Sequence, residues 1–290
     1  MKKKILMFIL VIGILAVVLA GCISKPPHKI FSDPWLDYEK ITYDVTRTLN
    51  DNTTKIKGTS TIITERVTDG NVKVGERDIN GFSGTYVEIN TQLEDGSIMI
   101  AQVAFKSSFE PIASYKNINI KGYEGNSPEK DINQVTNIYY ADEKCYYDTD
   151  FDGVKTSGNV KVGKWIKTPY YDNLMLYHIA RSSYISNSFS SLTTKVLSTG
   201  DFKMKTLTVS GSAINQEIKI FGEEGAVIKA DLVSISLNQT FPGSGTPMTV
   251  LLSREIKEDY NGLNLNSDRI PLIITEGKME YRISAYTSQK

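Results

Sequence analysis

The stretch Lys40-Ile41-Thr42-Tyr43-Asp44-Val45-Thr46 alternates polar and apolar side chains with a period of two. Successive side chains of a β-strand point to opposite faces, so Ile41, Tyr43 and Val45 share one face and the polar residues share the other. Such a strand has one dry face and one wet face, which is typical of an antiparallel sheet that covers a core. The same alternation recurs near the C-terminus, in Lys278-Met279-Glu280-Tyr281-Arg282-Ile283.

Short turn sequences separate the strand-like runs. Asp69-Gly70, Asp95-Gly96 and Asp152-Gly153 have the composition of tight hairpin turns, and Glu276-Gly277 marks another break. Breaks at this spacing predict an antiparallel meander of roughly a dozen strands. Twist accumulates across a sheet, so one sheet of that width must curl or close. We therefore predict a mainly β protein with a single large curved antiparallel sheet over residues 38–287.

One segment, at residues 172–181, interrupts the β pattern. Leu174, Tyr177, His178 and Arg181 recur there at helical spacing. Asp172 precedes them and has a side chain that favours the N-cap position of a helix. The sequence therefore predicts one short helix within the meander.

The N-terminus has the organisation of an export signal. Three lysines at positions 2–4 precede an apolar run at 5–20, which is long enough for a signal peptide and short for a membrane span. The run ends in Leu19-Ala20-Gly21-Cys22, which resembles the lipobox of prokaryotic lipoproteins. That resemblance implies cleavage before Cys22 and acylation of its thiol by palmitate-type chains. The alternative is an uncleaved membrane anchor with an incidental cysteine, and both interpretations tether the protein to a membrane outside the cytoplasm.

These features divide the chain into three parts: a signal peptide at 1–21, a tether at 22–37 and the curved β domain at 38–287. The tether contains Pro26-Pro27, which favours extended geometry. Removal of the signal peptide takes away three lysines and leaves a net charge of about −3. Ile23 follows the acylated cysteine in place of the aspartate associated with inner-membrane retention. In a cell with two membranes, we therefore expect the outer membrane.

The helical segment and its surroundings resemble a known family. Trp165-Ile166-Lys167-Thr168-Pro169-Tyr170-Tyr171-Asp172, the helix that follows it and the last strand resemble an uncharacterised family of exported bacterial proteins grouped with the lipoprotein-carrier (LolA-like) fold. The resemblance implies an unclosed barrel with the short helix on its concave side. It also implies an apolar ligand in the concavity, an acyl chain or a lipidated partner, and Tyr177, His178 and Tyr281 are the candidates to face it. The alternative is that the helix and the tyrosines fill the concave side.

Composition and motifs exclude several classes of function. The chain has 290 residues with 33 basic and 33 acidic side chains, so it lacks the concentrated positive charge of a nucleic-acid-binding protein. Two His and two Cys offer little for metal or nucleophilic chemistry, and we expect Cys145 to be a buried core residue. The sequence has no His-Glu-x-x-His motif, no Gly-x-Ser-x-Gly motif, no phosphate-binding loop and no dinucleotide-binding glycine pattern, and its Ser-x-x-Lys match at 127–130 is discounted because it contains a proline in a polar turn. We therefore predict a non-enzymatic binding lipoprotein, with an envelope-assembly interaction module as the alternative and an extracytoplasmic hydrolase as a less favoured third.

One acidic motif has the residues of a cation site. Asp148, Asp150 and Asp152, followed by Gly153, match the opening of a calcium-binding loop. The continuation departs from that loop, because Lys155 stands at the eighth position and Asn159 at the twelfth, where a bidentate Glu should close the site. An acidic hairpin tip explains the same residues, and we favour it over a weak calcium site.

Overall fold

The computed structural model describes residues 34–49, 52–123, 130–182, 190–219, 227–235, 248–253 and 269–289. Cys22, the predicted signal peptide and residues 22–33 of the predicted tether lie outside these ranges. Among the described residues, no helix combines the length and the apolar composition needed to cross a membrane.

The described residues form one sheet of 15 strands and one short helical segment. The strands are β1 (Tyr38–Thr48), β2 (Lys55–Val74), β3 (Arg77–Leu93), β4 (Ile98–Phe105), β5 (Pro111–Tyr123), β6 (Lys130–Ala141), β7 (Lys144–Phe151), β8 (Val154–Lys161), β9 (Tyr170–Asp172), β10 (Ser190–Ser198), β11 (Lys203–Lys219), β12 (Val227–Ile235), β13 (Met248–Ser253), β14 (Pro271–Glu276) and β15 (Met279–Gln289). The helical segment is η1 (Asn173–Met175), which continues as α2 (Leu176–Ser182).

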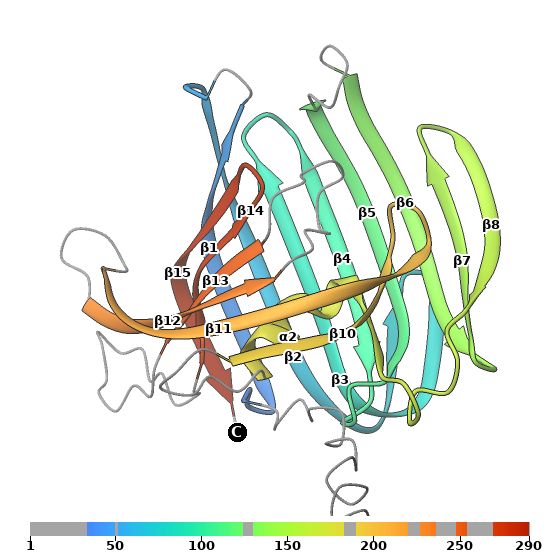
Figure 1. Cartoon of the computed structure of the whole chain (residues 1–290). Helices are drawn as coiled ribbons and strands as arrows, with labels where there is room; N and C mark the ends of the chain where they lie inside the picture. Colours follow the sequence, from blue (N-terminus) through green and yellow to red (C-terminus); the bar gives the residue numbers. More distant parts are fainter. Residues whose placement is uncertain are drawn as a thin grey trace, which may run out of the picture. The chain divides into compact units, whose positions relative to one another are not determined.

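The strand order is β8-β7-β6-β5-β4-β3-β2-β1-β15-β14-β13-β12-β11-β10-β9, with β8 and β9 at the two open ends (Figure 1). The predicted single large curved sheet is therefore confirmed. The pairing differs at one end, because β9 runs parallel to β10 whereas the other neighbours are antiparallel. The helical segment lies between β9 and β10 in the chain, and a crossover of this kind returns the chain in the same direction.

The predicted alternation positions the core. In β1, Ile41, Tyr43 and Val45 are buried, and their neighbours are more exposed. Val45 pairs with Tyr281 of β15, so the first and last long strands share this face. Tyr43 and Tyr281 meet edge to face with ring centroids 6.3 Å apart, a favourable aromatic geometry.

The longest hairpin, β2–β3, turns later than predicted. Asp69-Gly70 is a bulge within β2, where the register shifts and Asp69 has a φ of 47°. The hairpin turns at Gly75, whose φ of 59° is readily adopted by glycine. A bulge bends a strand without ending it. The end of the hairpin thereby packs on the neighbouring strands, where Val74 and Phe82 form a small core with alanines of β4 and β5.

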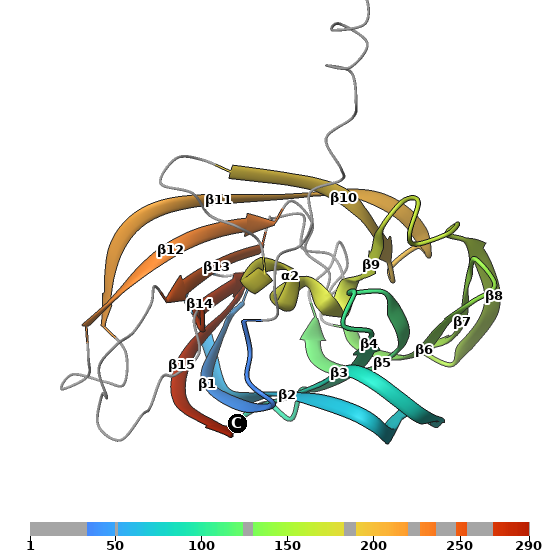
Figure 2. The same cartoon turned by 90° about the horizontal axis from the view of Figure 1, so that it is seen from below.

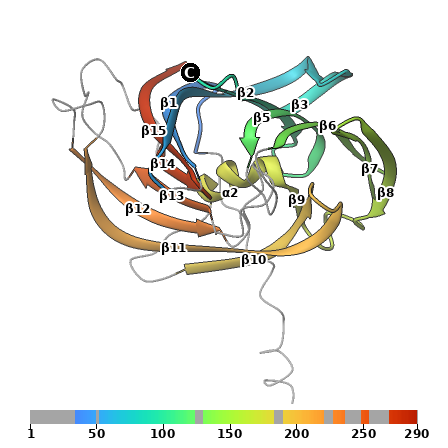
Figure 3. The ribbon, with the colours of Figure 1, turned by 90° about the horizontal axis from the view of Figure 1, so that it is seen from above.

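The predicted helix is confirmed, and it lies on the concave side of the sheet. Figures 2 and 3 show the sheet curling around α2. Asp172 adopts extended geometry at the N-cap and accepts a hydrogen bond from the amide of Leu174. All seven residues of α2 are buried. A helix this short is marginal in isolation, so its stability comes from packing against the sheet.

The packed domain begins before residue 38, the boundary predicted from the sequence. Trp35 is buried and meets Phe105, Phe109 and His178 edge to face. Its carbonyl oxygen accepts a hydrogen bond from Arg66. The period-two pattern that defined the boundary cannot detect a single aromatic residue inserted from an irregular segment.

Candidate functional site

The concave side of the sheet, where the sequence places the ligand-facing candidates, is occupied by α2. Its side chains reach strands on both sides of β1, which stands in the middle of the strand order: His178 contacts Thr64 of β2, Arg181 contacts Glu39 of β1 and Tyr177 contacts Glu276 at the end of β14. The helix therefore connects the two halves of the sheet through side chains.

The strongest of these contacts is a buried ion pair. Nη1 of Arg181 lies 2.7 Å from Oε2 of Glu39, and the two side chains are 2% and 0% exposed. The carboxylate also accepts hydrogen bonds from the Tyr286 hydroxyl at 3.0 Å and the Leu36 amide at 3.2 Å. Nε of Arg181 donates to the carbonyl oxygen of Arg269 at 3.0 Å. Buried charges are tolerated when they are paired and hydrogen-bonded in this way.

Arg269 completes the C-terminal end of the helix. Its guanidinium donates hydrogen bonds to the carbonyl oxygens of Ala180 and Arg181. These carbonyls belong to the last turn of α2, where positive charge is favourable. Arg181 and Arg269 thus bind each other's backbone and hold the end of α2 against the chain that leads into β14.

His178 is a neutral core residue. Its Nε2 atom lies 3.0 Å from the Thr64 hydroxyl, and its ring packs against Trp35 and Phe105. Burial, and second the positive charge of Arg181, lower the pKa of His178 to about 3. Nδ1 has no hydrogen-bond partner in the part of the chain that the structure describes. Because no carboxylate orients the ring there, the described contacts do not form a catalytic His–acid pair.

The other two ligand-facing candidates are also in contact with the protein. The Tyr177 hydroxyl donates to Oε2 of Glu276 at 3.0 Å, and Tyr281 packs on Tyr43. Burial raises the pKa of Tyr281 well above its ordinary value. Tyr177, His178 and Tyr281 therefore lie inside the curved sheet, as the sequence indicates, with protein groups where a ligand was expected.

A second polar group joins β9, at one end of the sheet, to β5 and β6 without strand pairing. Asp172, at the end of β9, accepts hydrogen bonds from Ser114 of β5 and Tyr140 of β6, both at 2.7 Å. Tyr140 also stacks on Tyr170 with ring centroids 5.8 Å apart. Burial raises the pKa of Asp172. Sequence reasoning identified Asp172 only as a helix cap, because its partners are separated from it by 32 and 58 positions.

We call the contact of Asp172 with Ser114 and Tyr140 the junction. A buried lysine lies near it. Lys116 of β5 donates to the Thr199 hydroxyl at 3.2 Å. Burial lowers the pKa of Lys116 to about 8, whereas the nearby carboxylates of Glu276 and Asp172 act in the opposite direction. The interior of the curved sheet therefore contains several charged groups, and not only the apolar side chains that the alternation indicated.

The three aspartates of the acidic motif lie at the β7–β8 hairpin. Asp152 and Gly153 form its two-residue turn with φ angles of 50° and 84°. The carboxylate of Asp152 accepts from the amide of Asn133, and that of Asp150 accepts from the amide of Gly153. Within the described ranges, no group of three His, Cys, Asp or Glu side chains is placed to hold a metal ion. Calcium binding here stays a prediction, and the contacts are those of a hairpin tip.

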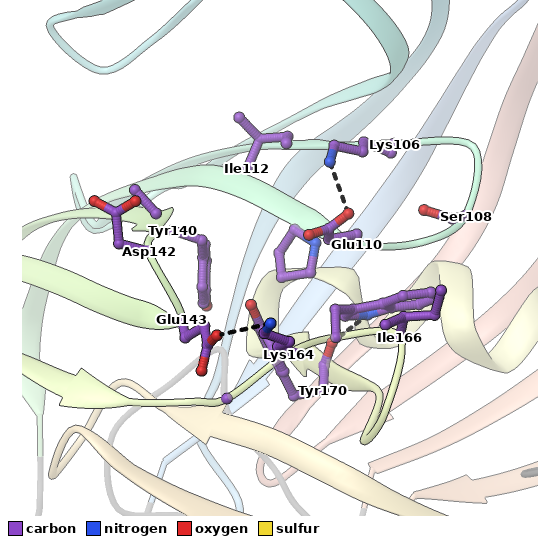
Figure 4. A pocket seen from close by; sticks show the side chains of 14 residues that line it. Lys106, Ser108, Glu110, Ile112, Tyr140, Asp142, Glu143, Lys164, Ile166 and Tyr170 are labelled. Atoms are coloured by element: carbon purple, nitrogen blue, oxygen red, sulfur yellow. Dashed lines mark hydrogen bonds and ion pairs between the residues drawn. The ribbon is translucent and has the colours of Figure 1, made fainter.

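An open groove lies on the outside of the junction, and Figure 4 shows its side chains. The groove has a volume of about 630 Å³. It is formed by the β4–β5 turn, the β6–β7 turn and the segment between β8 and β9. Its lining residues are Lys106, Ser108, Glu110, Pro111, Ile112, Tyr140, Ala141, Asp142, Glu143, Gly163, Lys164, Trp165, Ile166 and Tyr170.

The groove combines apolar side chains with a charged rim. Ile166 is 85% exposed, and the neighbouring Trp165 is held by a hydrogen bond from its indole nitrogen to the carbonyl oxygen of Tyr170. Two ion pairs border it: Lys106 with Glu110 at 2.7 Å, and Lys164 with Glu143 at 3.6 Å. Apart from the family resemblance, the sequence carries no signal that marks the Trp165–Ile166 pair as an exposed binding surface. Its exposure depends on the segment between β8 and β9, which periodicity does not describe.

Comparisons with known proteins find a likeness to solved structures but not to any family model or curated protein. A solved structure, a beta-barrel-like protein of the domain of unknown function DUF1849 from Brucella abortus, is similar over 88% of this chain and 99% of its own. The sequence identity is 9% and the TM-score is 0.45.

The buried histidine generates a pH prediction. Because the pKa of His178 is lower in the folded protein than its ordinary value of 6.5, the unfolded chain takes up a proton there first as the pH falls. We expect the free energy of unfolding to decrease below about pH 6.5, by at most about 1.4 kcal/mol per pH unit from this group. Urea unfolding of the wild type and of His178→Gln between neutral pH and about pH 4 measures it. The stability difference between the two proteins should change with pH, and a constant difference would contradict the assignment.

Proposed function

We propose that this protein is a lipid-anchored extracytoplasmic lipoprotein that acts as a non-enzymatic interaction module with a filled interior. The observation that carries this proposal is the burial of all seven residues of α2 on the concave side. A binding cavity for an acyl chain needs apolar surface that is free to contact the ligand. Here the three candidate ligand-facing residues contact Thr64, Glu276 and Tyr43.

The charges inside the sheet support the same choice. Glu39, Lys116, Asp172 and Glu276 are buried, and Glu39 and Glu276 bind side chains of α2. An acyl chain placed among these groups would separate charges and hydrogen-bonded pairs without replacing their partners, which costs free energy. Moving α2 aside for a ligand would break the Arg181–Glu39 pair and leave buried charge uncompensated.

The anchor is supported by the sequence and limits where the domain can act. Cys22 lies 13 positions before Trp35, the first of the described residues to be inserted into the core. A chain of that length spans at most about 45 Å when it is fully extended. A diacyl or triacyl anchor at Cys22 would hold the protein stably at the membrane. The domain would therefore meet partners at or near the membrane surface, outside the cytoplasm.

The groove at the outer side of the junction is the surface that we assign to the partner. An exposed apolar side chain beside an aromatic residue, surrounded by charged groups, is the arrangement of a protein interface with an apolar centre and a polar rim. Ile166 and Trp165 provide the apolar centre, and the two ion pairs provide the rim. We therefore propose a protein partner with a complementary apolar side chain.

Replacement of the lipobox cysteine tests the anchor. We expect Cys22→Ser to abolish incorporation of a palmitate analogue and to leave the signal peptide uncut, because the thiol is the acylated group. Metabolic labelling and the mass of the purified protein measure both effects. Cys145→Ser is the matched control, because that thiol is buried in the domain. Labelling that persists in Cys22→Ser, or that is lost in Cys145→Ser, would contradict the proposal.

Crosslinking in intact cells tests the interaction function. A photoreactive residue at the exposed position Thr168 should give one stoichiometric crosslinked protein, and Ile166→Glu should reduce its yield about tenfold through loss of about 1.4 kcal/mol of apolar contact. Val227→Glu is the control, because Val227 is 53% exposed elsewhere in the sheet. An unchanged yield in Ile166→Glu would contradict the groove assignment. Native mass spectrometry of the delipidated protein that repeatedly retains a lipid would instead favour the ligand-binding alternative.

A further inference from the structure

β8 is the last strand at one end of the sheet. It pairs with β7 on one side, and no described strand pairs with its other side (Figure 1). The strand is eight residues long, so it presents a row of backbone groups to any chain that can extend the sheet. Exposed edges of this kind are templates for strand addition.

The register of the β7–β8 hairpin shows which backbone groups point outward. Phe151 and Val154 flank the two-residue turn, so they form the first hydrogen-bonded pair of the hairpin. Hydrogen-bonded and non-hydrogen-bonded pairs alternate along an antiparallel ladder. The amide and carbonyl groups of Lys155, Ser157 and Asn159 therefore face away from β7.

The centre of this edge lacks the features that usually block strand addition. Natural edges are protected by inward-pointing charges, proline, bulges or a covering segment. In β8 the two lysines stand near the ends of the strand, and Thr156-Ser157-Gly158-Asn159 between them carries no charge. The edge also exposes apolar side chains at the hairpin tip, where Phe151 is 40% exposed and Val154 is 67% exposed.

We propose that a second copy of this chain pairs with β8 in antiparallel orientation, with Ser157 on the two-fold axis. This register places Val154 opposite Val160 of the second copy, and Lys155 opposite Asn159 of the second copy. About six backbone hydrogen bonds would form between the outward-facing groups. The exposed Val154 would gain an apolar cross-strand neighbour, which is the stabilising unit of a sheet.

Charge selects this register over its neighbour. A two-fold axis at Gly158 would place Lys155 opposite Lys161 of the second copy, twice in the dimer, and like charges directly opposite each other are destabilising. With the axis at Ser157, Lys161 lies opposite Gly153, next to the carboxylate of Asp152.

The dimer is isologous and closed, because each free β8 edge is used once. This inference is independent of the proposed function, because β8 is not among the strands that hold α2.

A cysteine on the two-fold axis tests the register in the full-length chain in its membrane. Residues opposite each other in a hydrogen-bonded pair have Cα atoms about 5.5 Å apart, within the range of roughly 4.4–6.8 Å that a disulfide spans. We expect Ser157→Cys to form a disulfide-linked homodimer under mild oxidation. Asn159→Cys is the matched control, because its symmetry mate lies four positions along the strand, about 13 Å away. We expect at least a tenfold difference in dimer yield between the two variants.

A charged residue at the edge provides a second measurement. Val154→Lys would place a lysine opposite Val160 of the second copy, so we expect a monomer by light scattering of the chain in detergent where the wild type is a dimer. Its thermal unfolding should match the wild type, because Val154 is largely exposed. A folded Ser157→Cys protein without a homodimer disulfide, equal crosslinking by Asn159→Cys, a disulfide to a different protein only, or a dimeric Val154→Lys would each overturn the proposal.

Discussion

The buried pair between Arg181 and Glu39 is the interaction on which the rest of the structure depends. A guanidinium and a carboxylate that are almost fully removed from water must remain together, because either one alone would be an uncompensated charge in a medium of low dielectric. The pair joins the end of α2 to β1, near the middle of the strand order. Curvature of the sheet and the position of the helix are therefore coupled: a flatter sheet would withdraw β1 from α2.

This coupling gives the interior a structural role. The helix contributes its side chains to both halves of the sheet, and Asp172 at its start joins β9 to β5 and β6 through hydrogen bonds. The open end of the sheet at β9 is thus joined to β5 and β6 by side chains, where a closed barrel would use backbone pairing between its end strands. The two surfaces that we propose for interaction lie elsewhere, at the groove beside Ile166 and at the edge of β8 that no described strand pairs with.

The sequence predicts those features that depend on local pattern. Alternation locates β1 and β15 and their buried faces, and helical spacing with an acidic cap locates η1 and α2. Asp69-Gly70 was predicted as a hairpin turn and is a bulge, because the same residues suit both and only pairing with β3 decides between them. Trp35 was assigned to a tether, because an aromatic residue in an irregular segment carries no periodic signal.

At the candidate site, too, local sequence pattern predicts where single residues lie, and contacts between distant residues cannot be predicted from it. Helix and strand periodicity makes Tyr177, His178 and Tyr281 the ligand-facing candidates of the sequence, and the structure buries all three. The sequence cannot show that Glu39 meets Arg181, because the two are 142 positions apart and the contact exists only when the sheet has curled. Glu39 lies on the same face of β1 as Ile41, Tyr43 and Val45 and is buried with them, but only the curled sheet brings its partner Arg181 to it.

Native-state hydrogen exchange of the α2 amides tests most directly whether the helix is a permanent part of the core. If it is, the amides of residues 176–182 exchange only through global unfolding, and their opening free energy falls with denaturant along the same line as the free energy of unfolding. Exchange through a separate opening that is several kcal/mol below the global value and insensitive to denaturant would contradict the account, since it would show that the concave side empties in the folded protein.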